Sequence, residues 1–156
     1  MHGDPKIIEA LNDILTAELT AINQYFVHFR MCDNWGYDKL AKKKRAESLE
    51  EMAHADKIID RILYLEGVPN VQRLYAVRVG QDATEQHQLD LEMEKSAVER
   101  YNKAISLCRE SGDNGTRELL VQLLKEEEEA VDWLEAQMHI IREIGKEHYL
   151  AQQIHS

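Results

Sequence analysis

The chain has 156 residues, of which 44% are hydrophobic and 31% charged, and its formal net charge is −10. This length suits one domain with a buried core, and no apolar run approaches the roughly 18 residues of a membrane span. The negative charge argues against nucleic acid binding, which requires a basic surface; it is compatible with cations, although solubility alone explains it. The first six residues lack the apolar stretch of a signal peptide, so we expect a cytoplasmic protein.

The first two helices are predicted over residues 5–34 and 37–65. Asp4 can act as an N-cap in front of Pro5, a residue favoured at the first helical position. Apolar residues then recur three and four positions apart, which is the period of an amphipathic helix. Gly36 marks a tight turn between the two helices.

A long connection is expected over residues 66–82, which lack a helical period and contain a β-rich run at 74–79. Two further long helices are predicted over residues 83–111 and 116–144, and a short amphipathic helix over 147–155. Two tight turns and one long connection between four long helices predict an all-α four-helix bundle with one crossover. In this topology the first and second helices pair as a hairpin, as do the third and fourth.

We expect a single domain without repeats or low-complexity segments. It covers residues 1–156, with the bundle at 5–144. Cys32 and Cys108 have neither metal-like nor redox-like spacing, and in a reducing cytoplasm they are expected to be two free thiols.

Every long helix carries a carboxylate where an apolar residue would continue its buried stripe. These interruptions fall at Glu18, Glu94 and Glu127, and the second helix has Glu51 and His54 on its stripe. A single glutamate in such a stripe is usually a half-exposed residue. Four converging carboxylates are different, because burying them without a compensating cation would disfavour the fold. The pattern therefore predicts a metal pair inside the bundle.

The spacing of these residues narrows the choice of metal. Glu-x-x-His in the second helix places two ligands on one face, one turn apart. Together with single carboxylates from other helices, this is the di-iron arrangement of carboxylate bundles. Oxygen-rich ligands with one imidazole suit iron or manganese better than zinc or copper(I). The predicted ligands are Glu18, Glu51, His54, Glu94 and Glu127.

The sequence resembles the bacterioferritin family over essentially its whole length. The five predicted ligands stand at the positions of that family's ferroxidase ligands, and local segments match at residues 21–26, 54–56, 61–67 and 132–135. The resemblance implies a ferritin-like bundle that oxidises Fe(II) with dioxygen. It also implies a shell of twenty-four copies that stores Fe(III) mineral, and a redox partner for iron release.

Met52 is predicted to face outward, because it lies about 100° round the helix from Glu51. Such a residue alone is usually a surface or interface hydrophobe. In bacterioferritins a methionine at this place meets its copy across a two-fold axis, and the two sulfurs ligate one haem. The resemblance therefore implies that Met52 is an axial ligand of haem b shared by two subunits, and that the haem assists iron release.

The sequence departs from the family at Ala130, where a histidine would complete a second Glu-x-x-His with Glu127. His139 lies about 18 Å farther along the same helix than Glu127, and His87 lies about 10 Å from Glu94, so neither replaces the missing histidine easily. The iron position served by Glu94 therefore lacks its nitrogen ligand. Either water completes that position or the second site is weak.

Two other functions stay open. The first is a haem-binding structural subunit with an impaired ferroxidase site, which co-assembles with a competent second subunit; Ala130 supports it. The second is a di-metal oxygenase or peroxidase on the same bundle. That function requires a substrate cavity, of which the aliphatic stripes give little sign.

The remaining polar and aromatic residues have simpler interpretations. Tyr25 and Trp133 are expected to be core aromatics near the carboxylates rather than redox-active groups. Glu47, one turn before the Glu-x-x-His motif, is either an accessory iron site or a paired charge. The charged runs at 42–45 and 126–129 are expected to be solvated surface, apart from the ligand Glu127.

Overall fold

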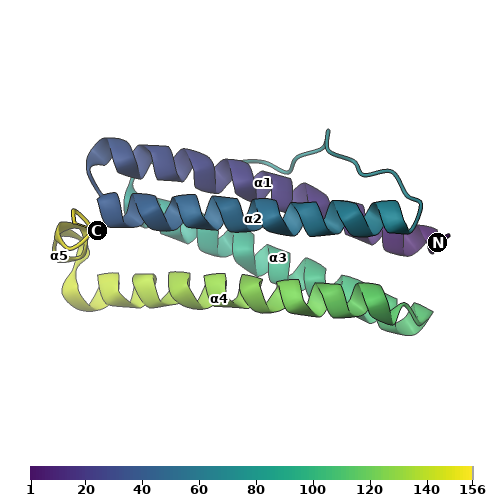
Figure 1. Ribbon diagram of the computed structural model, residues 1–156. Coiled ribbons are helices and arrows are strands. Elements are labelled where there is room, and N and C mark those ends of the chain that lie inside the picture. The colour runs from purple at the N-terminus through teal and green to yellow at the C-terminus, as the bar shows by residue number, and fades with distance from the viewer. Residues whose placement is uncertain (156) are drawn as a thin grey trace.

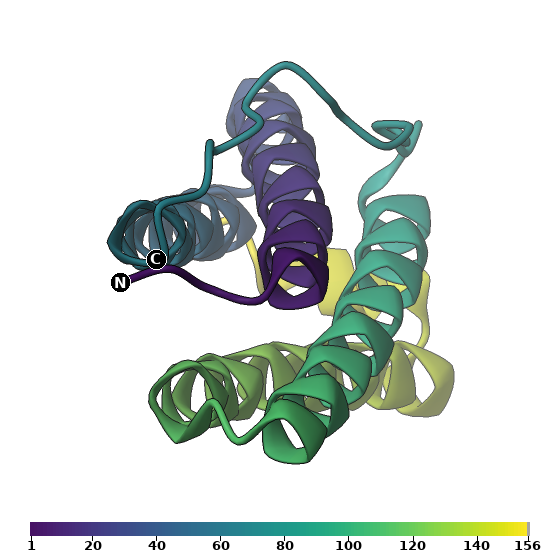
Figure 2. The same ribbon diagram turned by 90° about the vertical axis from the view of Figure 1, so that its right-hand side faces the viewer.

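The computed structural model describes residues 1–155, which form four long helices and one short helix. They are α1 (Pro5–Trp35), α2 (Asp38–Tyr64), α3 (Ala83–Ser111), α4 (Asn114–Ile144) and α5 (Lys146–Ala151). The helices α1 and α2 pair as one hairpin and α3 and α4 as the other, while α1 also packs against α3 and α2 against α4 (Figures 1 and 2). This is a four-helix bundle with one crossover, which confirms the predicted all-α topology.

Local caps explain where the helices begin and end. The Asp4 carboxylate accepts a hydrogen bond from the Lys6 amide at 2.8 Å, so it caps α1 as predicted. Gly36 ends α1 with φ 85°, a backbone conformation in which a side chain would be strained. The last helix is shorter than the predicted range of 147–155. After its end at Ala151, the Gln153 carbonyl accepts a hydrogen bond from the Lys39 amide at 3.0 Å, which ties the chain to the start of α2.

The crossover between α2 and α3 runs as an extended chain beside α1 (Figure 2). Its β-rich run at 74–79 forms no strand, because its amides bond to α1 side chains instead. The Tyr75 amide donates to Thr20 Oγ1 at 2.9 Å, and the Arg78 amide donates to Gln24 Oε1 at 3.1 Å. The α1 side chains that hold the crossover are polar and recur every four residues: Asn12, Thr16, Thr20, Gln24 and His28.

The interior of the bundle is layered along its axis. An apolar core that includes Leu11 and Leu120 fills one end, and Cys108 belongs to it. A smaller apolar cluster with Cys32 and Tyr149 closes the other end, next to α5. Both cysteines are buried free thiols, as expected. Buried polar and charged side chains fill the space between the two clusters.

No helix within residues 1–155 is both long enough and apolar enough to cross a membrane. The stripes of the four long helices instead alternate apolar residues with buried carboxylates, amides and a lysine. Charges at these positions have to be compensated inside the bundle. The layer between the two apolar clusters therefore holds the candidate functional groups.

Candidate metal centre

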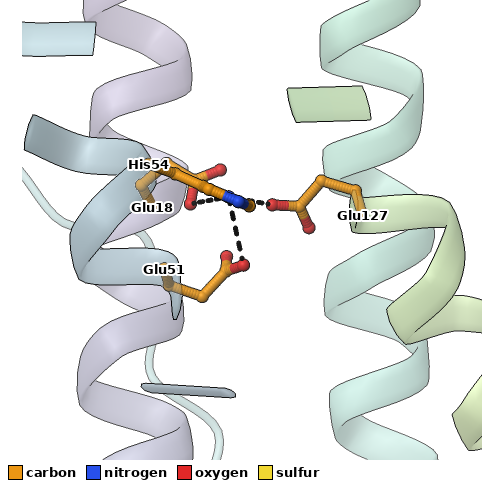
Figure 3. Close-up of side chains that lie close together, drawn as sticks. All are labelled: Glu18, Glu51, His54 and Glu127. Atoms are coloured by element: carbon orange, nitrogen blue, oxygen red, sulfur yellow. Dashed lines mark hydrogen bonds and ion pairs between the residues drawn. The ribbon is translucent and has the colours of Figure 1, made fainter. Parts of the chain in front are cut away.

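All five predicted ligands are buried in the middle layer, and they come from all four long helices. Four of them each bring one ligand atom within 4.8 Å of the others: Glu18 from α1, Glu51 and His54 from α2, and Glu127 from α4. Figure 3 shows the His54 ring pointing across the bundle, between the carboxylates of its own helix pair and Glu127 of the other. Glu94, from α3, is buried but lies outside this tightest group.

One nitrogen of the His54 ring faces three carboxylates. Its Nδ1 lies 3.0 Å from Glu127 Oε1 and 3.4 Å from both Glu18 Oε2 and Glu51 Oε1. The hydroxyl of Tyr101 donates a hydrogen bond to the second oxygen of Glu18 at 2.9 Å, which fixes that carboxylate. The Glu-x-x-His spacing thus produces the predicted convergence, because α2 turns both side chains toward the same point.

Burial keeps protons on this cluster. Desolvation and the charge of Glu127 raise the pKa of Glu18 to about 7. Desolvation and neighbouring carboxylates also raise the pKa values of Glu51 and Glu94 well above their usual range. Burial acts to lower the pKa of His54, but hydrogen bonds with Glu127 and Glu18 raise it to about 11. A cation that binds here has to displace these protons, so metal binding and proton release are coupled.

Several buried carboxylate oxygens have no hydrogen-bond partner. They are Glu18 Oε2, Glu127 Oε2 and both oxygens of Glu94. A desolvated acceptor without a donor is costly, and a coordinated cation satisfies it. Four carboxylates with one imidazole form a donor set that suits Fe(II) or Mn(II). The residues present therefore fit iron.

Comparison with known proteins agrees with this geometry. The family described as a ferritin-like domain matches residues 8–144. The bacterioferritin of Mycolicibacterium paratuberculosis is 49% identical over 152 residues, which cover 97% of this chain and 96% of that protein. This chain belongs to the bacterioferritin family. The bacterioferritins of Streptomyces coelicolor and Brucella melitensis are 48% and 46% identical, over 97% and 96% of this chain and 90% and 92% of their own lengths.

Among the residues that the structure describes, no histidine joins Glu94 in a group of potential metal ligands. Ala130 is buried one turn after Glu127 on α4, where the family pattern expects histidine. Within residues 1–155, His54 is the only histidine in a group of potential metal ligands. His87 bonds elsewhere in the bundle, and His139 is exposed. The weaker second iron position expected from Ala130 stays a prediction, and the buried alanine is compatible with it.

Glu126 was predicted to belong to a mostly solvated face, and its side chain is 41% exposed. The prediction missed its contact with the centre, because Glu126 Oε2 lies 2.5 Å from His54 Nε2. Glu50, His54 and Glu126 form a second group of potential ligands, which extends from the buried centre toward the surface between α2 and α4. Glu47 forms an ion pair with Lys43 at 3.0 Å, which favours the paired-charge interpretation.

Lys44, predicted to belong to a charged surface run, is completely buried. Its ammonium donates to Asp90 Oδ2 at 2.6 Å and to His87 Nδ1 at 3.0 Å. Asp90 also accepts hydrogen bonds from Gln24 and from His28 Nδ1, both at 2.9 Å. The prediction fails because these buried partners compensate a charge that periodicity assigned to solvent.

The network around Lys44 reaches α5. Burial and the Lys44 charge lower the pKa of His87, so its ring is neutral. With Nδ1 accepting from Lys44, Nε2–H donates to the Tyr149 hydroxyl at 2.9 Å, which in turn donates to Gln137 at 2.7 Å. Burial acts to raise the pKa of Asp90, but Lys44 and His28 hold it well below its usual range.

The remaining predicted residues lie where the helical period placed them. Met52 faces outward and is 52% exposed, and Phe26 and Leu49 on the same hairpin are exposed as well. Tyr25 is fully buried, with its hydroxyl lacking a hydrogen-bond partner, and Trp133 is half-buried. Burial, and then the charges of Glu94 and Asp90, raise the pKa of Tyr25 well above its usual range.

Proposed function

We propose that this bacterioferritin stores iron and oxidises Fe(II) with dioxygen at the buried carboxylate centre. Family membership supports iron storage. The observation that carries the ferroxidase activity is the convergence of Glu18, Glu51, His54 and Glu127 within 4.8 Å, beside the unpartnered oxygens of Glu94. A bound cation compensates these buried carboxylates, which otherwise hold protons.

The five side chains divide between two iron positions. Glu51 and Glu127 would bridge the positions, Glu18 and His54 would complete the first, and Glu94 would serve the second. For His54 to act as a ligand, its Nδ1 has to lose the proton that Glu127 and Glu18 now stabilise. The substrate Fe(II) therefore replaces protons as the positive charge that holds the cluster together.

The reaction needs both positions to be filled. Two Fe(II) ions each give one electron to one dioxygen molecule, which also takes two protons and leaves as hydrogen peroxide. The protein fixes the number and arrangement of ligands and leaves room for dioxygen. The Fe(III) product is stored as mineral inside a shell of twenty-four subunits, which we place in the cytoplasm.

The outer face of α2 supports a haem site. Met52 carries an exposed thioether, and the exposed Phe26 and Leu49 of the same hairpin offer apolar contact. Across a two-fold axis, Met52 of each of two chains would hold one shared haem b through its sulfur. The haem would supply a one-electron redox group for iron release, with electrons from a redox partner.

A second candidate function rests on Ala130. A subunit whose second iron position lacks nitrogen would oxidise iron slowly, yet still bind haem and build a shell. Such a chain would co-assemble with a second bacterioferritin subunit that carries a complete site. Ala130 is the specific observation in its favour, because it is buried one turn from Glu127 and leaves Glu94 without an imidazole.

Anaerobic titration of the assembled protein with Fe(II), followed by rapid mixing with dioxygen, tests the function. We expect saturable binding and dioxygen consumption, both reduced in Glu127→Gln but kept in Glu128→Gln, whose glutamate is exposed. Binding without appreciable oxidation would favour the structural subunit. Oxidation that is identical in both variants would contradict the proposed site.

A further inference from the structure

A pocket of about 270 Å³ opens on the face of the bundle formed by α1, α3 and the crossover. Its wall contains small and apolar side chains: Ala17, Ala21, Ala76, Leu89, Met93 and Ala97. The aliphatic stripes predicted little space beside the carboxylates, and the structure differs. The alanines leave this space because each lacks the side chain that would fill the junction of α1, α3 and the crossover.

The pocket reaches the metal centre at Glu94. Glu94 lines the pocket and is completely buried, with neither carboxylate oxygen bonded. Two other wall residues are neighbours of proposed ligands, since Ala17 precedes Glu18 and Ala97 follows Glu94 by one turn of α3. Glu94 therefore borders both the pocket and the carboxylate cluster.

Two polar side chains of the wall, Thr20 and Gln24, are already engaged in hydrogen bonds. Thr20 Oγ1 donates to the Thr16 carbonyl at 2.7 Å and accepts from the Tyr75 amide. The Gln24 amide group donates to Asp90 and accepts from the crossover backbone. These groups have little capacity left to coordinate a cation or to hold a chain of ordered water.

The charges of the wall disfavour Fe(II). Arg78 is paired with Glu92 at 2.7 Å, and the Arg100 guanidinium stacks over the Tyr75 ring at 4.3 Å. Arg100 forms no ion pair within the described part of the chain, so it contributes an uncompensated positive charge. A divalent cation is repelled by such a charge, whereas a neutral molecule is not.

The opposite face of the bundle carries carboxylates beside the metal centre instead of an apolar pocket. Since α1 packs on α3 and α2 on α4, the α2/α4 face lies across the bundle from the pocket (Figure 2). There the partly exposed Glu50 and Glu126 lead to His54. The two faces of the centre thus differ in charge, with carboxylates on one and an arginine beside an apolar pocket on the other.

We propose that the α1/α3 pocket is the route by which dioxygen reaches the Glu94 side of the metal centre. This inference rests on the ferroxidase function proposed above. Dioxygen is small, uncharged and apolar, so it partitions into a space lined by alanine, leucine and methionine. The Arg100 charge does not oppose it, and Glu94 separates the pocket from the carboxylates.

Xenon tests the pocket without any catalysis, because it is an apolar probe that occupies dry cavities. A crystal of the unmodified protein is pressurised with xenon, and its anomalous scattering is mapped. We expect a xenon peak among Ala21, Met93 and Ala97. Absence of xenon from this pocket overturns the inference.

Filling the pocket tests its part in oxidation. In Ala97→Leu we expect the KM for dioxygen to rise about tenfold, which corresponds to about 1.4 kcal/mol, with unchanged anaerobic Co(II) binding. If Ala97→Leu fails to assemble, Ala17→Leu provides the same measurement, because Ala17 is a half-exposed residue of the pocket wall. Ala136→Leu makes the same substitution at an exposed site outside the pocket. Rapid oxidation with an unaltered dioxygen dependence in both pocket variants overturns the route and leaves the ferroxidase function intact.

Discussion

The Lys44 ammonium lies 2.6 Å from the Asp90 carboxylate, and neither side chain reaches solvent. Lys44→Met leaves Asp90 without its counter-charge, so we expect a loss of about 3–5 kcal/mol in the free energy of unfolding. The double variant Lys44→Met/Asp90→Asn removes both charges and should lose less than the two single variants added together. Urea unfolding of the metal-free protein measures each value.

Lys42→Met is the matched control, because Lys42 stands two residues away and is exposed. We expect it to change the free energy of unfolding by less than about 0.5 kcal/mol. Equal losses in Lys42→Met and Lys44→Met would show that the buried pair contributes no more than a surface lysine.

Acidification should remove the stabilisation that the charged Asp90 side chain provides. The pKa of Asp90 is lower in the folded protein than in the unfolded chain, where the pKa of an aspartate is about 3.9. Its stabilisation is therefore complete above that value and declines as the pH falls toward the folded pKa. We expect the difference in unfolding free energy between the unmodified protein and Asp90→Asn to shrink between about pH 5 and about pH 3. A constant difference over this range would mean that the Asp90 charge is not the cause.

Replacing Glu51 and replacing Glu94 by alanine should have different effects on metal binding. Glu51 belongs to the tight group around His54 and is proposed to bridge, whereas Glu94 lies outside that group. Glu51→Ala should abolish metal binding at both positions, and Glu94→Ala at only one. Anaerobic Co(II) titration followed by absorbance counts the positions. Equal partial losses in the two variants are incompatible with a bridging Glu51.

Met52→Leu should leave the shell assembled and remove the haem. Leucine keeps the apolar volume of Met52 but has no sulfur to coordinate iron. The haem absorbance band and the particle size of the purified shell are the two measurements, and Met138→Leu on α4 is the control. Haem retained at full stoichiometry in Met52→Leu would identify a different ligand.

Ala130→His should complete the second iron position. The imidazole would stand one turn from Glu127 and give the Glu94 side the nitrogen ligand it lacks. We expect higher occupancy of the second position and a faster first phase of Fe(II) oxidation, measured by stopped flow. Glu129→His places the same group on the exposed side of α4 and should change neither. An unmodified protein that is already as fast as Ala130→His would mean that another group completes the site.

The fold could be predicted because its determinants are local. Apolar period, caps and glycines place both ends of each long helix within two residues of the observed ends, with the largest difference at the start of α4, Asn114 instead of 116. The ligand candidates followed from the same periodicity, since a glutamate in an apolar stripe is visible without knowing its neighbours. Glu18, Glu51 and Glu127 were found in this way, and the structure brings them together.

The Lys44 network could not be predicted, because its partners are far apart in the chain. Lys44 and Asp90 are 46 residues apart, and Lys44 stands in a run of basic residues that is typical of a surface. One signal was available, since Lys44 lies one turn before the buried Ser48 and two turns before Glu51 on the α2 stripe. Glu126 gave no such signal, because it is adjacent to Glu127 and therefore off the buried stripe.

The hydrogen bonds between α1 and the crossover make the length of the crossover matter more than its side chains. Backbone amides of Tyr75, Arg78 and Gly80 meet acceptors on successive turns of α1, so each contact depends on position along the chain. A residue deleted between Arg73 and Gly80 would shift every later amide off its acceptor. Substitution of an outward-facing side chain would leave those contacts in place. This segment can therefore vary in sequence but not in register.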